Sequence, residues 1–261
     1  MPYIQLDTTR IHYETVGKGT PVVLLHGLGG SLNDWYFNTD YLSEHYQLIM
    51  FDIPGFGNSD LIDNYTLPQV AQQIVRAIQH LNLSSVDIVG LSLGGAIAMD
   101  IGVNQHTYGL TVNSIVVFNS QPAYKLIGAK AYFEYYLRVC LIKMIGLPAL
   151  SNTIAKRLFP KPGQEALRQY AQSHLRQNSS EAYLAVIKAL TQWDISIPLQ
   201  SLASPLLVVA SDGDYPSLDS KGYVTDTPSA RLHLVENCGH AIPIEQPQQS
   251  ADIIKQFLKA Q

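Results

Sequence analysis

Residues 85–99 read Ser85-Val86-Asp87-Ile88-Val89-Gly90-Leu91-Ser92-Leu93-Gly94-Gly95-Ala96-Ile97-Ala98-Met99. A short apolar run ends at Gly90 and a segment of small residues follows, which predicts a strand, a sharp turn and a helix. The turn holds the pattern G-x-S-x-G, with Ser92 between Gly90 and Gly94. A serine on a strained strand-to-helix turn is raised above the sheet, and flanking glycines avoid Cβ clashes with neighbouring backbone. The pattern also fits a glycine-rich turn with an incidental serine, but the flanking strand and helix favour a nucleophile.

Composition and charge favour a compact α/β domain. The chain has 261 residues, of which 46% are hydrophobic and 15% charged, which allows the large core of a sheet covered on both faces. The net charge of -4 gives no electrostatic reason to expect nucleic acid or an anionic membrane as a partner. Two cysteines are too few for a disulfide framework, and no Cys/His spacing resembles a metal site.

The N-terminal sequence lacks the basic and apolar regions of a signal peptide. Uninterrupted apolar runs are also shorter than the roughly 18 residues of a membrane span. We therefore expect a cytoplasmic protein with no membrane span.

Apolar runs alternate with helical segments on both sides of the central turn. Besides the strand before Ser92, the pattern predicts strands at Tyr3–Leu6, Arg10–Val16, Pro21–Leu25, Tyr46–Ile53, Ser114–Phe118, Pro205–Ala210 and Arg231–Val235. Helices are predicted near Leu32–Leu42, Leu67–Leu81 and Pro247–Leu258. This alternation predicts an α/β fold with a mostly parallel, doubly wound sheet.

The alternation stops between about Tyr124 and Trp193, where only helical segments are predicted, at 129–143, 150–158, 164–177 and 180–192. A single crossover helix seldom needs about 70 residues, so this region is interpreted as an inserted helical cap. The expected domains are a core of residues 1–121 and 198–261 and a cap of residues 122–197. Aromatic residues crowd the first cap helix, and Phe133 and Tyr136 are candidates for a substrate pocket as well as for core packing.

A serine hydroxyl needs a histidine to accept its proton, and a carboxylate best orients that imidazole. Such residues belong on loops at the carboxyl ends of parallel strands. Two loops qualify: residues 211–215 carry Asp212 and Asp214, and residues 237–241 carry His240. The chain order is then Ser, Asp, His.

This ordered set of patterns resembles the α/β-hydrolase family over essentially the whole chain. The matching motifs are His26-Gly27, the D-x-x-G-x-G-x-S pattern of residues 52–59, the Gly90–Gly94 turn, Asp214 and Gly239-His240. The resemblance implies the α/β-hydrolase fold, with Ser92 as nucleophile, His240 as general base and Asp214 as its orienting acid. It also implies an oxyanion hole formed by the backbone N–H groups of Leu28 and Leu93.

Asp212 is the competing candidate for the acid. In relatives the acid stands just before a proline-containing turn, and Asp214-Tyr215-Pro216 fits that placement better. Some relatives carry the acid after the preceding strand, where this chain has Asn119, an amide without charge to stabilise an imidazolium.

Other polar residues receive structural interpretations. His26 is expected to hold its loop by backbone hydrogen bonds, residues 52–59 to form a supporting turn, and Cys238 to pack. His12 and the remaining histidines show no partner pattern.

The expected function is that of a serine hydrolase, an esterase-like enzyme cleaving an ester or related acyl bond through an acyl-enzyme at Ser92. Its expected partner is a small, fairly apolar acyl compound. The same groups serve lactonases, thioesterases and C–C bond hydrolases, and a non-catalytic ligand-binding or receptor protein on this fold is the alternative of another class. The glycines at 27, 29 and 30 fail as a dinucleotide fingerprint because Leu32 occupies the third glycine position, so no cofactor is expected. The oligomeric state stays open.

Overall fold

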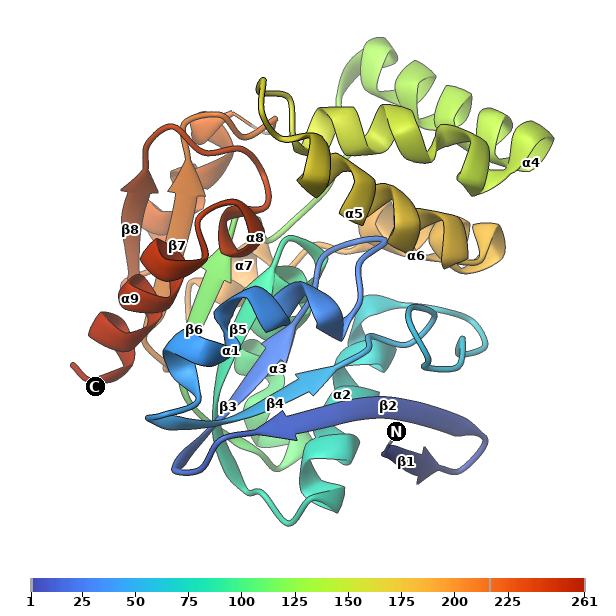
Figure 1. Cartoon of the computed structure of the whole chain (residues 1–261). Helices are drawn as coiled ribbons and strands as arrows, with labels where there is room; N and C mark the ends of the chain where they lie inside the picture. The colour runs from blue at the N-terminus through green and yellow to red at the C-terminus, as the bar shows by residue number, and fades with distance from the viewer. Residues whose placement is uncertain (1, 216, 261) are drawn as a thin grey trace.

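The computed structural model describes residues 2–215 and 217–260, so Pro216, which helped to select Asp214, lies outside the described residues. Its eight-stranded sheet has the order β1-β2-β4-β3-β5-β6-β7-β8 (Figure 1). The strands are β1 (Tyr3–Leu6), β2 (Thr9–Val16), β3 (Thr20–Leu25), β4 (Tyr46–Phe51), β5 (Ser85–Leu91), β6 (Thr111–Phe118), β7 (Leu206–Ser211) and β8 (Ala230–Val235). β1 and β2 pair antiparallel with each other and β2 with β4, and the remaining pairs are parallel.

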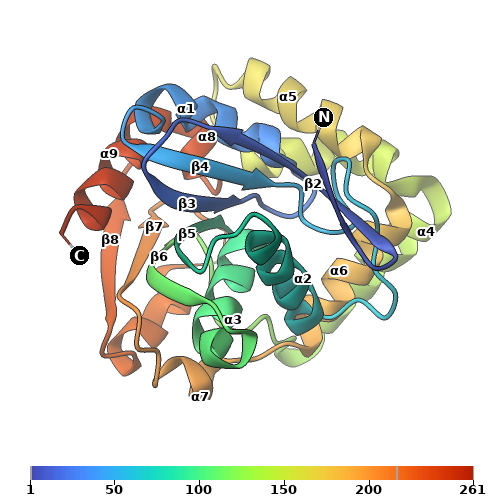
Figure 2. The same ribbon diagram turned by 90° about the horizontal axis from the view of Figure 1, so that it is seen from below.

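Helices cover both faces of this sheet, which confirms the predicted doubly wound arrangement. One face carries α1 (Tyr36–Leu42), α8 (Ile242–Glu245) and α9 (Pro247–Leu258), and the other carries α2 (Leu67–His80) and α3 (Leu93–Tyr108) (Figure 2). Alternate residues of one strand enter different cores: Val23 and Leu25 pack on the side of α2, Val22 and Leu24 on the side of α1. The central strands are mostly apolar because neither face meets water, and the buried Asp87 of β5 is paired with Ser114 of β6.

The helical insertion lies between β6 and β7. It contains α4 (Gly128–Leu158), α5 (Glu165–Gln177), α6 (Ser180–Gln192) and α7 (Ser196–Leu199), and the first three lie above the carboxyl ends of the parallel strands (Figure 1). The two helices predicted at 129–143 and 150–158 form one element that breaks at Gly146, whose φ is 80° and ψ 158°. The helix predicted near Leu32–Leu42 is present as η1 (Leu32–Trp35) followed directly by α1. Short helices that the sequence pattern missed are η2 (Leu218–Asp226), α7 and α8.

The two ends of the insertion are fastened to each other and to the core. Ala123 and Asp194 form an isolated antiparallel bridge, and Lys125 Nζ lies 2.5 Å from Asp194 Oδ2. Trp193 Nε1 donates to Asp100 Oδ2 of α3 over 2.8 Å. These contacts fix where the insertion enters and leaves the sheet domain.

Candidate active site

Ser92 stands on the predicted turn between β5 and α3. Its φ of 52° and ψ of -107° are strained for a residue with a side chain. A Cβ at Gly90 would overlap the backbone of Gly94, and one at Gly94 would overlap the carbonyl of Leu25. Glycine is therefore required on both sides of Ser92, as the sequence predicted.

Hydrogen bonds hold this turn in place. The Ser92 amide donates to the Phe118 carbonyl over 2.9 Å, and Ser120 Oγ donates to the Ser92 carbonyl over 2.8 Å. The Gly94 amide donates to the His26 carbonyl over 3.1 Å, which joins the turn to the loop after β3. The strained serine is thus fixed by its neighbours on β3 and β6.

His240 and Asp214 come from the loops after β8 and β7. His240 Nδ1 lies 2.6 Å from Asp214 Oδ1, and both side chains are buried. The oxygens of Asp212 instead accept the amides of Asn237 and Cys238, and these hydrogen bonds lower the pKa of Asp212. The structure therefore brings Asp214, and not Asp212, to the imidazole.

A buried lysine stands behind this pair. Lys221 Nζ lies 3.6 Å from Asp214 Oδ2, and the two side chains are each only 1% exposed. Burial lowers the pKa of the Lys221 ammonium, and the Asp214 carboxylate acts in the opposite direction. Sequence reasoning missed Lys221 because it lies in a polar segment, where a lysine is normally solvated.

Asn119 fastens the His240 loop to the sheet. Its Nδ2 donates to the carbonyl of His240 and to Ser211 Oγ, each over 2.8 Å, and its Oδ1 accepts the amide of Ser211 over 3.0 Å. Asn119 thus contacts the backbone of residue 240 and not its ring. The position considered for a catalytic acid holds an anchoring residue.

The supporting roles predicted for His26 and residues 52–59 are confirmed. His26 Nδ1 lies 2.8 Å from the Gly27 carbonyl, and its Nε2 accepts the amide of Ile53 over 2.9 Å. Asp52 accepts the amides of Leu32 and Asn58, each over 2.8 Å. No partner for His12 was predicted, yet its Nδ1 lies 2.7 Å from Asp52 Oδ2 inside the protein.

The predicted oxyanion donors come from the two segments joined at this point. Leu93 is the first residue of α3, where amides have no acceptor within the helix, and Leu28 lies in the loop after β3. Within the part of the chain that the structure describes, neither amide has an acceptor in another segment. Both are suited to stabilise an oxyanion formed at Ser92.

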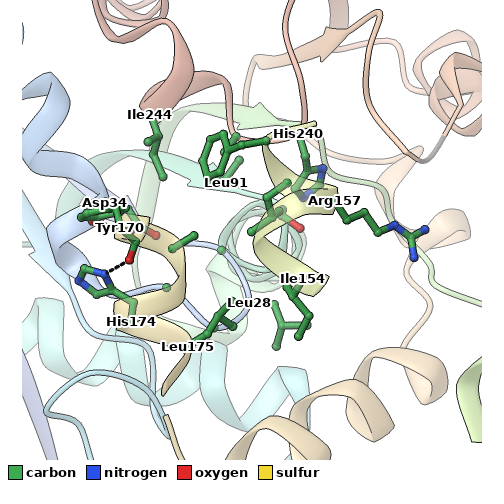
Figure 3. A pocket seen from close by; sticks show the side chains of 18 of the residues that line it. Leu28, Asp34, Leu91, Ile154, Arg157, Tyr170, His174, Leu175, His240 and Ile244 are labelled. Atoms are coloured by element: carbon green, nitrogen blue, oxygen red, sulfur yellow. Dashed lines mark hydrogen bonds between the residues drawn. The ribbon is translucent and has the colours of Figure 1, made fainter. Parts of the chain in front are cut away.

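A cavity that is partly open to solvent contains Ser92 and His240 in its wall. Its apolar lining comes from the loop after β3, the end of β5, the insertion and α8: Leu28, Leu91, Ile154, Leu158, Leu175 and Ile244. Asp34, Tyr170 and His174 gather at one end, and the Arg157 guanidinium points away from the cavity at the other (Figure 3). The cavity suits a mainly apolar compound with one polar end.

The polar end is an ordered cluster. Tyr170 Oη donates to Asp34 Oδ1 over 2.9 Å, and the Tyr170 and His174 rings lie 4.4 Å apart. Burial raises the pKa of Asp34.

At the opposite end of the cavity, the Tyr215 ring lies 4.3 Å from the His240 ring and is covered by the Arg157 guanidinium at 4.6 Å. Sequence reasoning missed this stack because its three members come from distant segments.

The two pocket candidates of the first cap helix were wrongly placed. Phe133 is 67% and Tyr136 62% exposed, both outside the cavity, and α4 contributes Arg138, Ile154, Arg157 and Leu158 to the lining instead. The aromatic pattern could not show which side of α4 faces inward, because residues on the inner side, such as Tyr135 and Ile142, are apolar too.

Within residues 2–215 and 217–260, no three or more His, Cys, Asp and Glu side chains are grouped to hold a metal ion. Burial raises the pKa of the Cys238 thiol to about 12, which agrees with a packing role.

Comparisons with known proteins define the class. Residues 22–253 match the model of the alpha/beta hydrolase family, and the chain belongs to this family. It is 26% identical to 3-oxoadipate enol-lactonase 1 of Acinetobacter baylyi, an alignment covering 92% of this chain and 88% of that protein. It is also 26% identical to the pimeloyl-[acyl-carrier protein] methyl ester esterase of Aeromonas salmonicida, over 95% and 99% of the two chains.

Solved structures agree with this assignment. The enol-lactonase from Burkholderia xenovorans LB400 matches with a TM-score of 0.89 at 20% identity, covering 99% of this chain and 100% of that one. At this identity the match speaks for the fold alone. The family and its named members make the protein a hydrolase.

Proposed function

We propose that this protein is a serine hydrolase that cleaves an ester or related acyl bond through an acyl-enzyme at Ser92. The observation that carries the proposal is a strained serine and a carboxylate-paired histidine in the wall of one cavity. Strain and buried ion pairs cost stability, and they gather at catalytic sites.

In the proposed mechanism each group has one role. Asp214 accepts a hydrogen bond from the Nδ1–H of His240, which leaves Nε2 as the acceptor for the Ser92 proton. Ser92 Oγ then attacks the acyl carbon, and His240 delivers the proton to the leaving group as the bond to it breaks. Water next gives a proton to His240 and attacks the acyl carbon. The bond between the acyl carbon and Ser92 Oγ then breaks, and His240 returns the proton to Oγ, which releases the acid and restores the Ser92 hydroxyl.

The oxyanion and the substrate body have their own contacts. The amides of Leu28 and Leu93 would stabilise the negative oxygen, and each such donor is worth roughly 3 kcal/mol in comparable enzymes. The apolar lining would hold the acyl body, with its polar end toward Asp34 and Tyr170. A small, fairly apolar acyl compound is the proposed substrate, and the cytoplasmic location stays a prediction.

The names of relatives guide the choice of substrates for assay. One relative is named a lactonase and another a methyl ester esterase, so lactones and short esters belong in the first panel. Thioesters and C–C bond substrates complete the panel because the same acyl-enzyme serves them.

Variants of the three residues test the proposal. Ser92→Ala should lower kcat at least about 10³-fold on every substrate cleaved, because the nucleophile is lost. Asp214→Asn should also lower kcat strongly, since the amide favours the wrong imidazole tautomer. Asp212→Asn is the matched control, and its kcat should stay within about tenfold of wild type.

Folded Ser92→Ala protein with activity near wild type would exclude Ser92 as the nucleophile. Equal losses in the two aspartate variants would contradict the assigned acid. If the wild type hydrolyses nothing in the panel yet binds these compounds, the non-catalytic ligand-binding alternative replaces the proposal.

A further inference from the structure

The side of α4 that faces away from the protein is apolar. Five side chains form this surface, called the outer α4 face: Phe133, Tyr136, Leu137, Cys140 and Met144. At about 100° per residue they lie opposite the inner stripe of Tyr135, Val139 and Ile142. Met144 is 75% exposed. A helix on the surface of a domain normally turns a polar side outward, so this face needs a partner.

Charge is unevenly divided between the insertion and the rest of the chain. Of 17 Lys and Arg, ten lie in residues 122–197, against four of the 21 Asp and Glu. The insertion is therefore strongly basic, and the remainder, with seven basic and 17 acidic residues, is strongly acidic. The net charge of -4 conceals this division.

Basic residues also flank the outer α4 face itself. Lys130 and Lys143 are exposed on the same helical segment, and Lys130 has only a 3.9 Å pair with Glu134. Lys143 has no ion pair within the described residues. An apolar and aromatic strip between lysines is the composition of helices that lie in a lipid interface.

A second copy of the chain is a poorer occupant. Two outer α4 faces in contact would bring two basic insertions together, and like charges repel. An anionic lipid surface supplies the opposite charge for the lysines and an apolar layer for Phe133 and Met144. Charge complementarity therefore favours the lipid surface.

α4 has the length and composition of a membrane span, but its structure fits a helix lying on the surface. The break at Gly146 interrupts it, and the segment before the break carries Lys130, Glu134, Arg138 and Lys143. A span would place Arg138, near the middle of that segment, in hydrocarbon, where charges are strongly disfavoured. Ile142 and the inner stripe also pack against the protein.

We propose that the outer α4 face docks the protein on an anionic phospholipid surface. The lysines contact headgroups while Phe133, Tyr136 and Met144 enter the boundary between headgroups and acyl chains. The same helix forms part of the cavity wall through Arg138 and Ile154. The binding itself does not rest on the proposed catalytic function.

Co-sedimentation of the full chain with vesicles tests the proposal. Vesicles of equal parts phosphatidylglycerol and phosphatidylcholine should bind the protein, and pure phosphatidylcholine vesicles should bind it far less. At about fivefold per basic residue near an anionic surface, Lys130→Glu/Lys143→Glu should weaken binding at least about 25-fold. Phe133→Ser/Tyr136→Ser should weaken binding to both vesicle types at least about tenfold.

Matched variants separate docking from general effects. Lys18→Glu reverses an exposed charge far from α4, and Leu232→Ser removes an exposed leucine on β8, so both should bind as the wild type does. Ser92→Ala should also bind unchanged, because docking is independent of hydrolysis.

Wild-type protein that stays in the supernatant with both vesicle types would overturn the proposal. The proposal would also be overturned if Lys130→Glu/Lys143→Glu and Phe133→Ser/Tyr136→Ser both bound vesicles as tightly as the wild type does. Light scattering that shows a wild-type dimer and a monomeric Phe133→Ser/Tyr136→Ser variant would assign the face to a second copy instead.

Discussion

Lys221 places a buried positive charge behind the Asp214–His240 pair, 3.6 Å from the second oxygen of Asp214. Asp214 contacts the His240 ring through Oδ1, and Lys221 approaches the other oxygen of the same carboxylate. Lys221 can therefore change the electrostatic field at the imidazole. It acts through Asp214 and positions charge without contacting the substrate.

We predict that Lys221→Met moves the rising limb of the pH profile of kcat/KM, because it removes a charge 3.6 Å from the carboxylate that contacts His240. Lys221→Arg should keep the limb in place. A Met variant that folds normally and has an unshifted limb would show that Lys221 only fills space.

At the scale of single residues, the sequence allowed prediction of the residues that sit in local patterns. Ser92 has its glycines within two positions, and Asp214 and His240 follow recognisable strands. The Lys221–Asp214 and His12–Asp52 pairs were not predictable, because each joins segments whose approach depends on the fold. Only the folded chain shows that these four side chains are buried.

At the scale of the elements, the proposed function implies that the cavity wall selects among acyl chain lengths. Ile154→Ala and Leu175→Ala should shift the preferred ester chain length, because each removes an apolar side chain from the cavity. The change in kcat/KM should be graded, at about 1–3 kcal/mol between neighbouring chain lengths. Phe133→Ala is the control for soluble esters, because its side chain lies outside the cavity.

Measuring kcat/KM over a series of p-nitrophenyl esters checks this prediction. If Phe133→Ala changed the dependence of kcat/KM on chain length while Ile154→Ala and Leu175→Ala did not, the substrate pocket would lie on the aromatic side of α4.

The ends of the insertion give a prediction about acid stability. The hydrogen bond from Lys125 lowers the pKa of Asp194 to about 2, below the value of about 3.9 in an unfolded chain. The folded state thus gains stability above about pH 4, which is lost as the pH falls toward about 2. Because the pair is partly exposed, the gain should be below about 1 kcal/mol.

Asp194→Asn should therefore be slightly less stable than the wild type at neutral pH, and the difference should shrink below about pH 4. Urea unfolding across this range measures it, with the exposed Asp63→Asn as control. A difference that stays constant down to the lowest pH would show that the ion pair does not contribute.

The α4 helix shows where prediction from sequence stops for an element. Its helical character followed from the sequence, but both of its sides are apolar, so periodicity did not reveal the inner one. The packing of α5 and α6 against α4 determines which of its two sides is buried. Boundaries were more predictable: Ser180–Gln192 and Pro247–Leu258 agree with the structure.

At the scale of the whole molecule, the alternation of apolar strands and helices was enough to predict the doubly wound sheet and the inserted helices. The division of charge between insertion and core is also present in the sequence, but only the fold shows that it coincides with an exposed apolar face. We propose that the sheet, the insertion and the cavity together form the site of a single nucleophile, Ser92.

Reaction with a fluorophosphonate followed by mass spectrometry tests that claim most directly. We predict one adduct per chain, located on Ser92, and a rate at least about 10³-fold lower in His240→Ala. No adduct on folded wild-type protein, or an adduct on another residue that persists in Ser92→Ala, would contradict the account.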